Sequence, residues 1–205
     1  MPKKEATKRK LQAEKSRNEI YDAAIELIRT TGFERTTIQA IIAKAGVSIG
    51  TFYHHFKSKD GIIEENFLRA DALFTRYLEE EPAESREAPS TERILRYMDR
   101  YARLVRDVGV DLSQQLYTCR NKLFLKEGRP MQVGLARIVA EGQARGDLID
   151  TKGAAEICSY LFIAARGLVF DWCLRDGKGD IEAELRSFLA PLVGLFARDG
   201  GRARG

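Results

Sequence analysis

The feature that most constrains this chain is the segment from 32 to 59, which has the pattern of two short helices joined by a tight turn. Apolar residues recur at helical spacing over 38–45, and Gly46 follows where a left-handed residue ends a helix. Ser48 is a favoured N-cap for a second helix, in which two phenylalanines four residues apart share one face. Small, hydroxylic, aromatic and imidazole side chains remain on the outer face, which suits a helix in a DNA major groove.

The rest of the chain also shows helical spacing, and no segment alternates as a half-buried strand would. We therefore predict an all-α protein of about nine helices. Its expected parts are a flexible basic arm at 1–14, a helix-turn-helix domain at 15–60, a connecting helix at 61–78 and a helical C-terminal domain at 79–205. That domain is expected to open with an acidic loop at 79–91 and to contain helices at 92–107, 111–126, 131–145, 152–174 and 180–197.

Charge is distributed unevenly along the chain. Residues 1–60 contain 12 Lys and Arg against 7 Asp and Glu, a net charge of +5, and the remainder contains 22 against 23, a net charge of −1. A basic N-terminal part beside a neutral remainder indicates a polyanion partner at one end, although a basic face can also be merely solvated. The basic arm residues Lys3, Lys4, Lys8, Arg9 and Lys10 either add DNA contacts or form a solubilising tail.

Composition narrows the class of protein. A hydrophobic content of 44% with 31% charged residues is typical of a soluble globular protein. No apolar run reaches the roughly 18 residues of a membrane helix, since Arg166 breaks the longest, and the Lys-rich start has no apolar stretch behind it. We expect a cytoplasmic protein without a membrane partner.

The longer segment around the two helices resembles the DNA-binding domain of the TetR family of transcriptional regulators. The resemblance rests on Thr-Thr-Ile-Gln at 36–39 and on Ala-Gly-Val-Ser-Ile-Gly-Thr-Phe-Tyr-His-His-Phe-Lys-Ser-Lys at 45–59. Residues 141–148 and 167–172 are similar to stretches of the family's C-terminal domain. The resemblance implies a homodimer with a three-helix DNA reader and a C-terminal domain that binds an effector and dimerises. Gly61 departs from the family, in which a charged or larger residue is common.

Several residues of this segment are expected to contact DNA. Thr36, Thr37 and Ser48 stand at helix N-termini, where they serve as phosphate anchors, as caps, or as both. Tyr53 and Lys59 match family positions that hold the DNA backbone, with a half-buried core position as the alternative for Tyr53. The residues expected to read bases or line the groove are Gln39, Ile49, Gly50, Thr51, His54 and His55. For the two histidines the alternatives are a solvated position and packing against the first helix.

Two further sets of residues are predicted in the C-terminal domain. The candidate effector pocket consists of Tyr97, Tyr101, Gln115, Cys119, Phe162, Arg166 and Phe170, with an ordinary core as the alternative. Its apolar character favours an apolar or aromatic effector with one acidic or carbonyl group. The candidate dimer interface consists of Leu168, Trp172, Leu185, Phe188 and Leu192.

The sequence offers little for catalysis. It has no Ser/His/Asp or Cys/His order, no phosphate loop and no metal-ligand pair at i, i+4. Cys119, Cys158 and Cys173 are too scattered for a disulfide framework or a zinc site, and are either buried small hydrophobes or thiol sensors. We predict a transcriptional regulator without enzymatic activity, cofactor or metal: a repressor that an effector releases from a palindromic operator. The alternatives are an effectorless DNA-binding protein with a protein partner, and a helical enzyme or interaction module.

Overall fold

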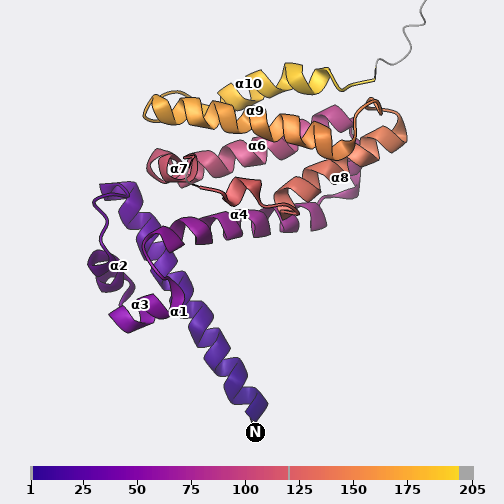
Figure 1. Cartoon of the computed structure of the whole chain (residues 1–205). Helices are drawn as coiled ribbons and strands as arrows, with labels where there is room; N and C mark the ends of the chain where they lie inside the picture. The colour runs from indigo at the N-terminus through magenta and orange to yellow at the C-terminus, as the bar shows by residue number, and fades with distance from the viewer. Residues whose placement is uncertain (1, 120, 199–205) are drawn as a thin grey trace, which may run out of the picture. The chain divides into compact units, whose positions relative to one another are not determined.

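A computed structural model describes residues 2–119 and 121–198 of the chain (Figure 1). This part is helical, with no strand and one isolated antiparallel bridge between Leu148 and Ala197. It forms two compact units, residues 1–68 and 69–205. The helices are α1 (Pro2–Thr31), α2 (Ile38–Ala45), α3 (Ile49–His55), α4 (Asp60–Glu79), α5 (Ala83–Glu87), α6 (Ser90–Val108), α7 (Val110–Leu116), the short 3₁₀ helix η1 (Leu123–Leu125), α8 (Pro130–Arg145), α9 (Ala154–Leu174) and α10 (Ile181–Gly194).

The first unit is the predicted helix-turn-helix domain. Both of its short helices begin and end where the sequence indicates. The Thr37 hydroxyl accepts a hydrogen bond from the Ala40 amide at 3.1 Å, and Gly46 ends α2 at φ +65°, which only glycine adopts without strain. The core of the unit is made of the buried side chains of Ile20, Ala24, Ile28, Ile41, Phe52, Phe56 and Ile62. In α4 the side chain of Ile62 is fully buried, whereas that of Ile63 is only partly buried.

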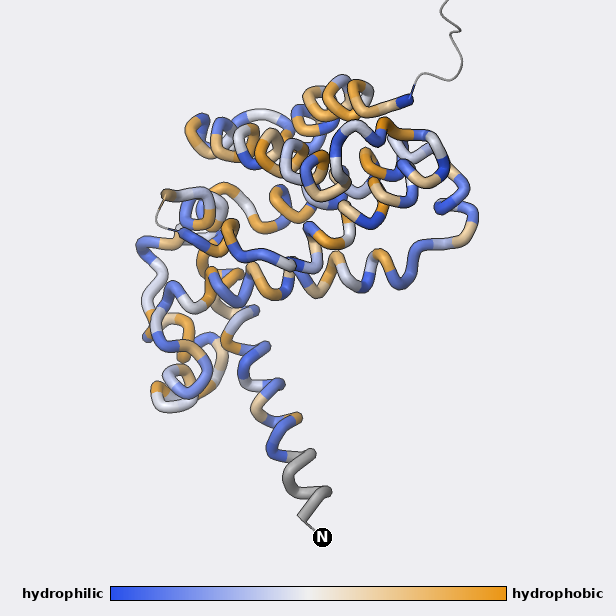
Figure 2. The backbone as a smooth tube through the Cα atoms, turned by 45° about the vertical axis from the view of Figure 1, so that its right-hand side comes forward, coloured by the Kyte–Doolittle hydropathy of each residue, from blue (hydrophilic) through white to orange (hydrophobic). Residues whose placement is uncertain are grey.

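The arm expected over residues 1–14 is helical. α1 begins at Pro2 and runs without a break to Thr31, so the prediction of an irregular segment was wrong. Two physical reasons account for the helix. Proline is favourable at the first helical position, and the segment is rich in Lys, Arg, Glu, Gln and Ala, which have high helix propensity even without an apolar stripe. Figure 2 shows that the described part of this extension is mainly hydrophilic.

The second unit is a helical bundle around one core. α10 packs against α6 and α9, and α8 packs against α6 and α9. The fully buried side chains include Tyr97, Leu112, Leu135, Ile138 and Ile157. The interior faces of these helices therefore supply one continuous apolar core.

Two predicted elements of this unit differ from the structure. The acidic segment 79–91 contains α5 and the start of α6, and Glu81 is buried against Arg93 rather than exposed. The helix expected over 111–126 ends at Leu116. The Asn121 amide donates to the Leu116 carbonyl, and its side-chain oxygen accepts from the Leu123 amide, so that local side-chain bonds replace helical ones.

One helix of the described chain, α9, is long and apolar enough to cross a membrane by length and composition alone. Eight of its residues, including Leu161 and Val169, are buried in the second unit. Such burial is what a core helix requires, and the apolar character of α9 is therefore explained by packing.

Candidate nucleic-acid interface

Helix α3 is anchored by its inner face and presents its outer face. Phe52 and Phe56 are buried, at 0% and 3% exposure, and fix the rotation of the helix. The Ser48 hydroxyl accepts from the Thr51 amide at 3.1 Å and lies 2.9 Å from the Thr51 hydroxyl. The predicted outer residues Ile49, Gly50, Tyr53 and His54 are exposed, and Thr51 and His55 are partly exposed. A short, well-capped helix with this polar and small-residue face fits a DNA groove.

Three predicted DNA-contact residues lie at the start of α2 or just before it, and two of them are exposed. Thr37 and Gln39 are exposed at the start of α2. Thr36 is only 2% exposed, and its hydroxyl donates to the Gly32 carbonyl at 2.8 Å. Its amide is also bonded, to the Gly32 and Phe33 carbonyls. The prediction of Thr36 as a phosphate anchor was therefore wrong. Thr37 is the N-cap of α2, and the hydrogen bonds of Thr36 stabilise the turn that precedes it.

Lys59 joins two turns of the first unit. Its ammonium group donates to the Phe33 carbonyl at 2.7 Å and to the Glu34 carbonyl at 3.4 Å, and lies 4.2 Å from the centre of the Phe33 ring. The side chain is partly exposed. Lys59 thus has an internal structural role beside the DNA contact that the sequence predicts for it.

His55 faces α1, as one of its sequence alternatives anticipated. Its Nε2 lies 2.8 Å from the Ser16 hydroxyl. Burial lowers the pKa of His55, and the adjacent His54 and Arg17 lower it further. Arg17 in turn donates to the Glu65 carboxylate at 2.5 and 3.0 Å, which ties α1 to α4 within this unit. Near neutral pH the imidazole is therefore neutral and can exchange hydrogen bonds with Ser16.

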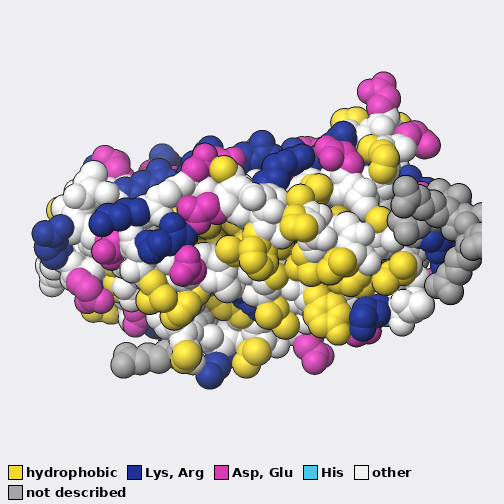
Figure 3. Space-filling view, turned by 90° about the horizontal axis from the view of Figure 1, so that it is seen from above, with side chains coloured by type: hydrophobic (Ala, Val, Ile, Leu, Met, Phe, Trp, Pro, Cys, Tyr) yellow, Lys and Arg dark blue, Asp and Glu magenta, His cyan; other side chains and the backbone are white. Residues whose placement is uncertain are grey.

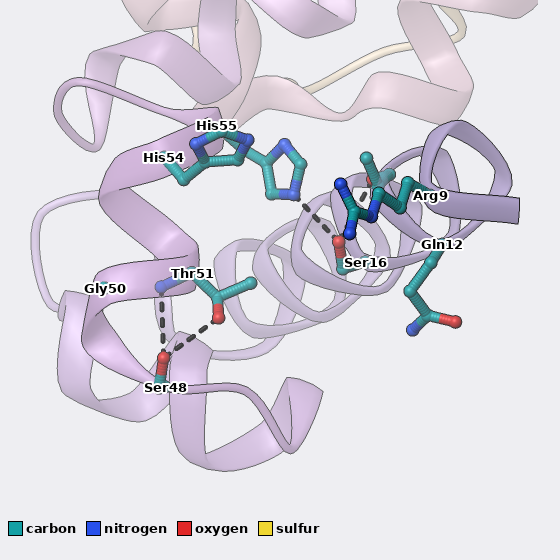
Figure 4. A pocket seen from close by; sticks show the side chains of 9 residues that line it. Arg9, Gln12, Ser16, Ser48, Gly50, Thr51, His54 and His55 are labelled. Carbon is teal, nitrogen blue, oxygen red and sulfur yellow. Dashed lines mark hydrogen bonds between the residues drawn. The ribbon is translucent and has the colours of Figure 1, made fainter. Parts of the chain in front are cut away.

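A hollow of about 520 Å³ lies between α3 and the N-terminal part of α1 (Figure 4). Its lining consists of Arg9, Gln12, Ala13, Ser16, Ser48, Gly50, Thr51, His54 and His55. Arg9 was named from the sequence only as part of an arm, and Gln12 and Ser16 were missed. The available signal was their spacing of three and four residues, which puts them on one face once the segment is helical.

The predicted effector residues fall into different environments in the second unit. Tyr97 belongs to the core and donates to the Met131 carbonyl at 2.7 Å, Cys119 is exposed, Gln115 is partly buried, and Phe170 is 50% exposed. Phe162 and Arg166 do line a common hollow, of about 270 Å³. Its full lining is Gly128, Gln132, Val133, Ala136, Ala155, Cys158, Ser159, Phe162 and Arg166. The structure therefore brings together two of the seven residues there.

An aromatic cluster adjoins this hollow. The Tyr101 ring packs edge-on against Phe162, at 5.8 Å between centres, and its hydroxyl lies 2.5 Å from that of Tyr117. The Tyr117 ring packs at a tilt against the Phe124 ring, and the Arg166 guanidinium lies 5.5 Å from the centre of the same Phe124 ring. Burial raises the pKa of Tyr101 to about 12, so both tyrosines remain protonated at neutral pH.

The predicted dimer residues divide between core and surface. Trp172 and Leu185 are buried within the second unit, Leu168 and Leu192 are partly buried, and Phe188 is 53% exposed. The exposed apolar side chains of α9, and of α10 with the residue that follows it, include three that the sequence interpretation omitted: Ile163, Leu174 and Leu195. Figure 3 shows hydrophobic side chains gathered across this face.

A three-helix unit that presents a capped recognition helix, joined to a helical bundle, defines a helix-turn-helix DNA-binding regulator. A sequence model described as "Bacterial regulatory proteins, tetR family" matches residues 20–65. Residues 20–65 of this chain therefore match the DNA-binding segment of the TetR family of transcriptional regulators.

Relatives extend the match beyond the DNA-binding segment. The chain is 26% identical over 181 residues to the fatty acid metabolism regulator protein of Bacillus subtilis, which covers 85% of this chain and 92% of that protein. It is 41% identical to the transcriptional repressor KstR2 of Mycolicibacterium smegmatis over 64 residues, 30% of each chain. The crystal structure of Bacillus subtilis FadR in complex with stearoyl-CoA has the same fold, with a TM-score of 0.68, 24% identity and coverage of 85% of this chain and 96% of that one.

Proposed function

We propose that this protein is a repressor that binds a palindromic DNA operator as a homodimer and is released by an apolar small molecule with an acidic or carbonyl group. The observation that carries the proposal is the exposed face of α3, held by the buried Phe52 and Phe56. Selection of bound sequences from random DNA, followed by a screen of ligands for release, tests it. A palindromic consensus supports the proposal, and a failure to enrich any sequence contradicts it.

The homodimer is supported by the apolar face of α9 and α10. Ile163, Phe170 and Leu174 lie along one side of α9, Phe188 lies on α10 and Leu195 directly follows α10; all are at least half exposed. Large apolar side chains that gather at the surface of neighbouring helices are typical of a protein–protein contact. Pairing of this face with a second copy is isologous and gives the two recognition helices the two-fold symmetry of a palindrome.

The effector site is proposed at the hollow between α8 and α9. Its walls are apolar, with Val133, Ala136 and Phe162, and its polar groups include Gln132 and Arg166. Arg166 has no ion pair or hydrogen bond within the described part of the chain, so its guanidinium is available to an acidic or carbonyl group. The name of the Bacillus subtilis relative, a fatty acid metabolism regulator, favours an acyl compound as the effector.

The size of the hollow limits what it accepts without movement. Its volume of about 270 Å³ lies at the lower end for ligand pockets, which usually measure about 300–1,000 Å³. A longer chain therefore requires side chains that line the hollow to move. An effector shifts the equilibrium between the DNA-binding and released forms only if it binds the released form more tightly than the DNA-binding form.

A buried ion pair links this hollow to α4. Gly128 is part of the lining, and the next residue, Arg129, donates to both carboxylate oxygens of Asp71 at 3.1 and 3.2 Å. Both side chains are largely buried. Because α4 runs unbroken from Asp60 in the first unit to Glu79 in the second, this pair supports α4 as the element that transmits effector binding.

Replacement of His54 by alanine is expected to relax DNA specificity. His54 is exposed on α3, and a good base contact contributes about 1–3 kcal/mol of discrimination. The measurement is selection from random DNA with wild type and variant, and preference should be lost at one position of each half-site. His55→Ala is the control on the same helix. It loses the Ser16 contact and should change affinity without that positional loss. An unchanged consensus for His54→Ala would leave His54 as a solvated side chain.

Replacement of Arg166 by alanine is expected to weaken effector binding about tenfold or more, because a charge-assisted hydrogen bond is lost. Thermal stabilisation by a series of fatty acids and acyl thioesters measures this, together with release of operator DNA. Arg137→Ala on α8 is the matched control, since Arg137 pairs with Glu141 and does not line the hollow. Equal responses of both variants to every ligand would contradict the assignment of Arg166.

A second candidate, an effectorless DNA-binding protein with a protein partner, is favoured by the dense core. Tyr97 and Tyr101, which the sequence placed in a pocket, are both fully packed. The screen discriminates the two candidates, because an effectorless protein binds its operator and responds to no ligand.

A further inference from the structure

The N-terminal extension of α1 forms one wall of the hollow beside α3. Arg9, Gln12 and Ser16 follow one another at three and four residues and line this hollow together (Figure 4). At 3.6 residues per turn this spacing keeps all three side chains on the same face of α1. The opposite wall is α3, which supplies Ser48, Thr51 and His54.

The chemistry of the hollow suits an anionic chain. Its described lining contains a guanidinium, two imidazoles, an amide and three hydroxyl groups, and no carboxylate is among these described residues. An entering phosphate therefore meets hydrogen-bond donors and no like charge. The carboxylate of Glu65, which lies in the same unit, is already bound by Arg17.

Small residues contribute to the lining of the hollow, and a hydrogen bond joins its two walls. Ala13 and Gly50 stand on opposite walls, and a Cβ at Gly50 would meet only the Ser48 hydroxyl, at 3.7 Å. The 2.8 Å contact between Ser16 and His55, which both line the hollow, joins α1 to α3. The walls are thus held in place without side chains filling the space between them.

We propose that one strand of the DNA backbone lies in this hollow, with Arg9 bound to a phosphate and Gln12 hydrogen-bonded to the same strand. The proposal rests on the proposed function, because its occupant is the DNA read by α3. DNA is the expected occupant because the hollow is continuous with the DNA-binding face of α3. Gly50, Thr51 and His54 belong both to the hollow and to that face. Arg9 is exposed and has no ion pair with any side chain that the structure describes, so its charge is available to a phosphate.

The test compares Arg9→Ala with Lys10→Ala on the operator selected with wild-type protein. Both variants remove one positive charge from α1, but adjacent helical residues point about 100° apart, and Lys10 does not line the hollow. Alanine has the highest helix propensity, so neither change should disturb α1, which circular dichroism can verify.

Equilibrium binding is measured over a series of salt concentrations. Arg9→Ala should raise Kd about tenfold near 0.1 M salt and flatten the slope of log K against log salt by about one per protomer, because one phosphate contact is lost. Lys10→Ala should change Kd less than about twofold. Gln12→Ala should weaken binding by a few fold with the salt slope unchanged, since an amide releases no counterion.

The outcomes separate this inference from the proposed function. If wild type binds no DNA, the proposed function fails. If wild type binds and Arg9→Ala equals Lys10→Ala in both Kd and salt slope, only the inference is overturned. A changed base preference for Arg9→Ala with an unchanged slope also overturns it, because Arg9 would then read bases rather than a phosphate.

Discussion

Replacing Phe170 and Phe188 together by glutamate is expected to give a folded monomer that binds its operator at least about 100-fold more weakly than wild type. Phe170 on α9 and Phe188 on α10 are 50% and 53% exposed, so the protomer loses little packing. In the proposed interface, however, each would bury a carboxylate without a partner, which costs several kcal/mol. A monomer binds one half-site at a time. It loses the gain in affinity that a dimer has when its second recognition helix is held close to the second half-site.

Sedimentation velocity at micromolar concentration measures the assembly, and binding to full and half operators measures the consequence. The half-site affinity should be almost unchanged, because α3 is intact. Leu125→Glu is the control, since Leu125 is 74% exposed in η1 and lies outside the α9–α10 face. A double variant that remains dimeric would contradict the proposed interface, and so would wild type that sediments as a monomer.

Replacement of Arg93 by alanine is expected to lower the free energy of unfolding by about 3–5 kcal/mol, the usual cost of leaving a buried charge without its partner. The Arg93 side chain is 2% exposed and donates to both carboxylate oxygens of Glu81 at 2.8 and 3.1 Å, and to Glu141 at 2.8 Å. Without it, the remaining ion pair of the buried Glu81 within the described residues is a distant one with Arg86, at 3.7 Å. Urea denaturation followed by circular dichroism gives the difference.

The matched control is Arg96→Ala on the same helix. Arg96 is 44% exposed and pairs with Glu92 four residues earlier, an arrangement that contributes about 0.3–0.5 kcal/mol. Combining Arg93→Met with Glu81→Gln should restore much of the stability lost in Arg93→Ala, because the uncompensated charge is removed. If the single variants at 93 and 96 unfold at the same urea concentration, the buried pair does not contribute as described.

The helix-turn-helix could be predicted in detail because its signals are local. Ser48 as an N-cap, Gly46 as a left-handed residue and the i, i+4 pair Phe52 and Phe56 each depend on neighbours within one helical turn. The choice between Thr36 and Thr37 was harder, since either can cap α2 by spacing. The structure shows that the Thr36 hydroxyl donates a hydrogen bond to the Gly32 carbonyl, which leaves Thr37 as the cap of α2.

The second unit shows the limit of periodicity. Helical spacing places Leu168, Trp172 and Leu185 on apolar faces, but it does not say which neighbour covers each face. Trp172 and Leu185 are packed inside the protomer, whereas Leu174 and Phe188 remain exposed. Likewise, Arg93 looks like any surface arginine until Glu81 and Glu141 are brought to it.

The sequence alone predicts the all-helical class, the DNA-binding segment and most of the residues on its outer face. These features depend on caps, glycine turns and i, i+4 spacing, which act within a few residues. Only the tertiary structure decided that Arg9 and Gln12 face α3. It also decided that Phe162 and Arg166 share a hollow without Tyr97. These outcomes depend on contacts between residues tens of positions apart, and the periodicity of a single helix contains no information about the partner that its faces meet.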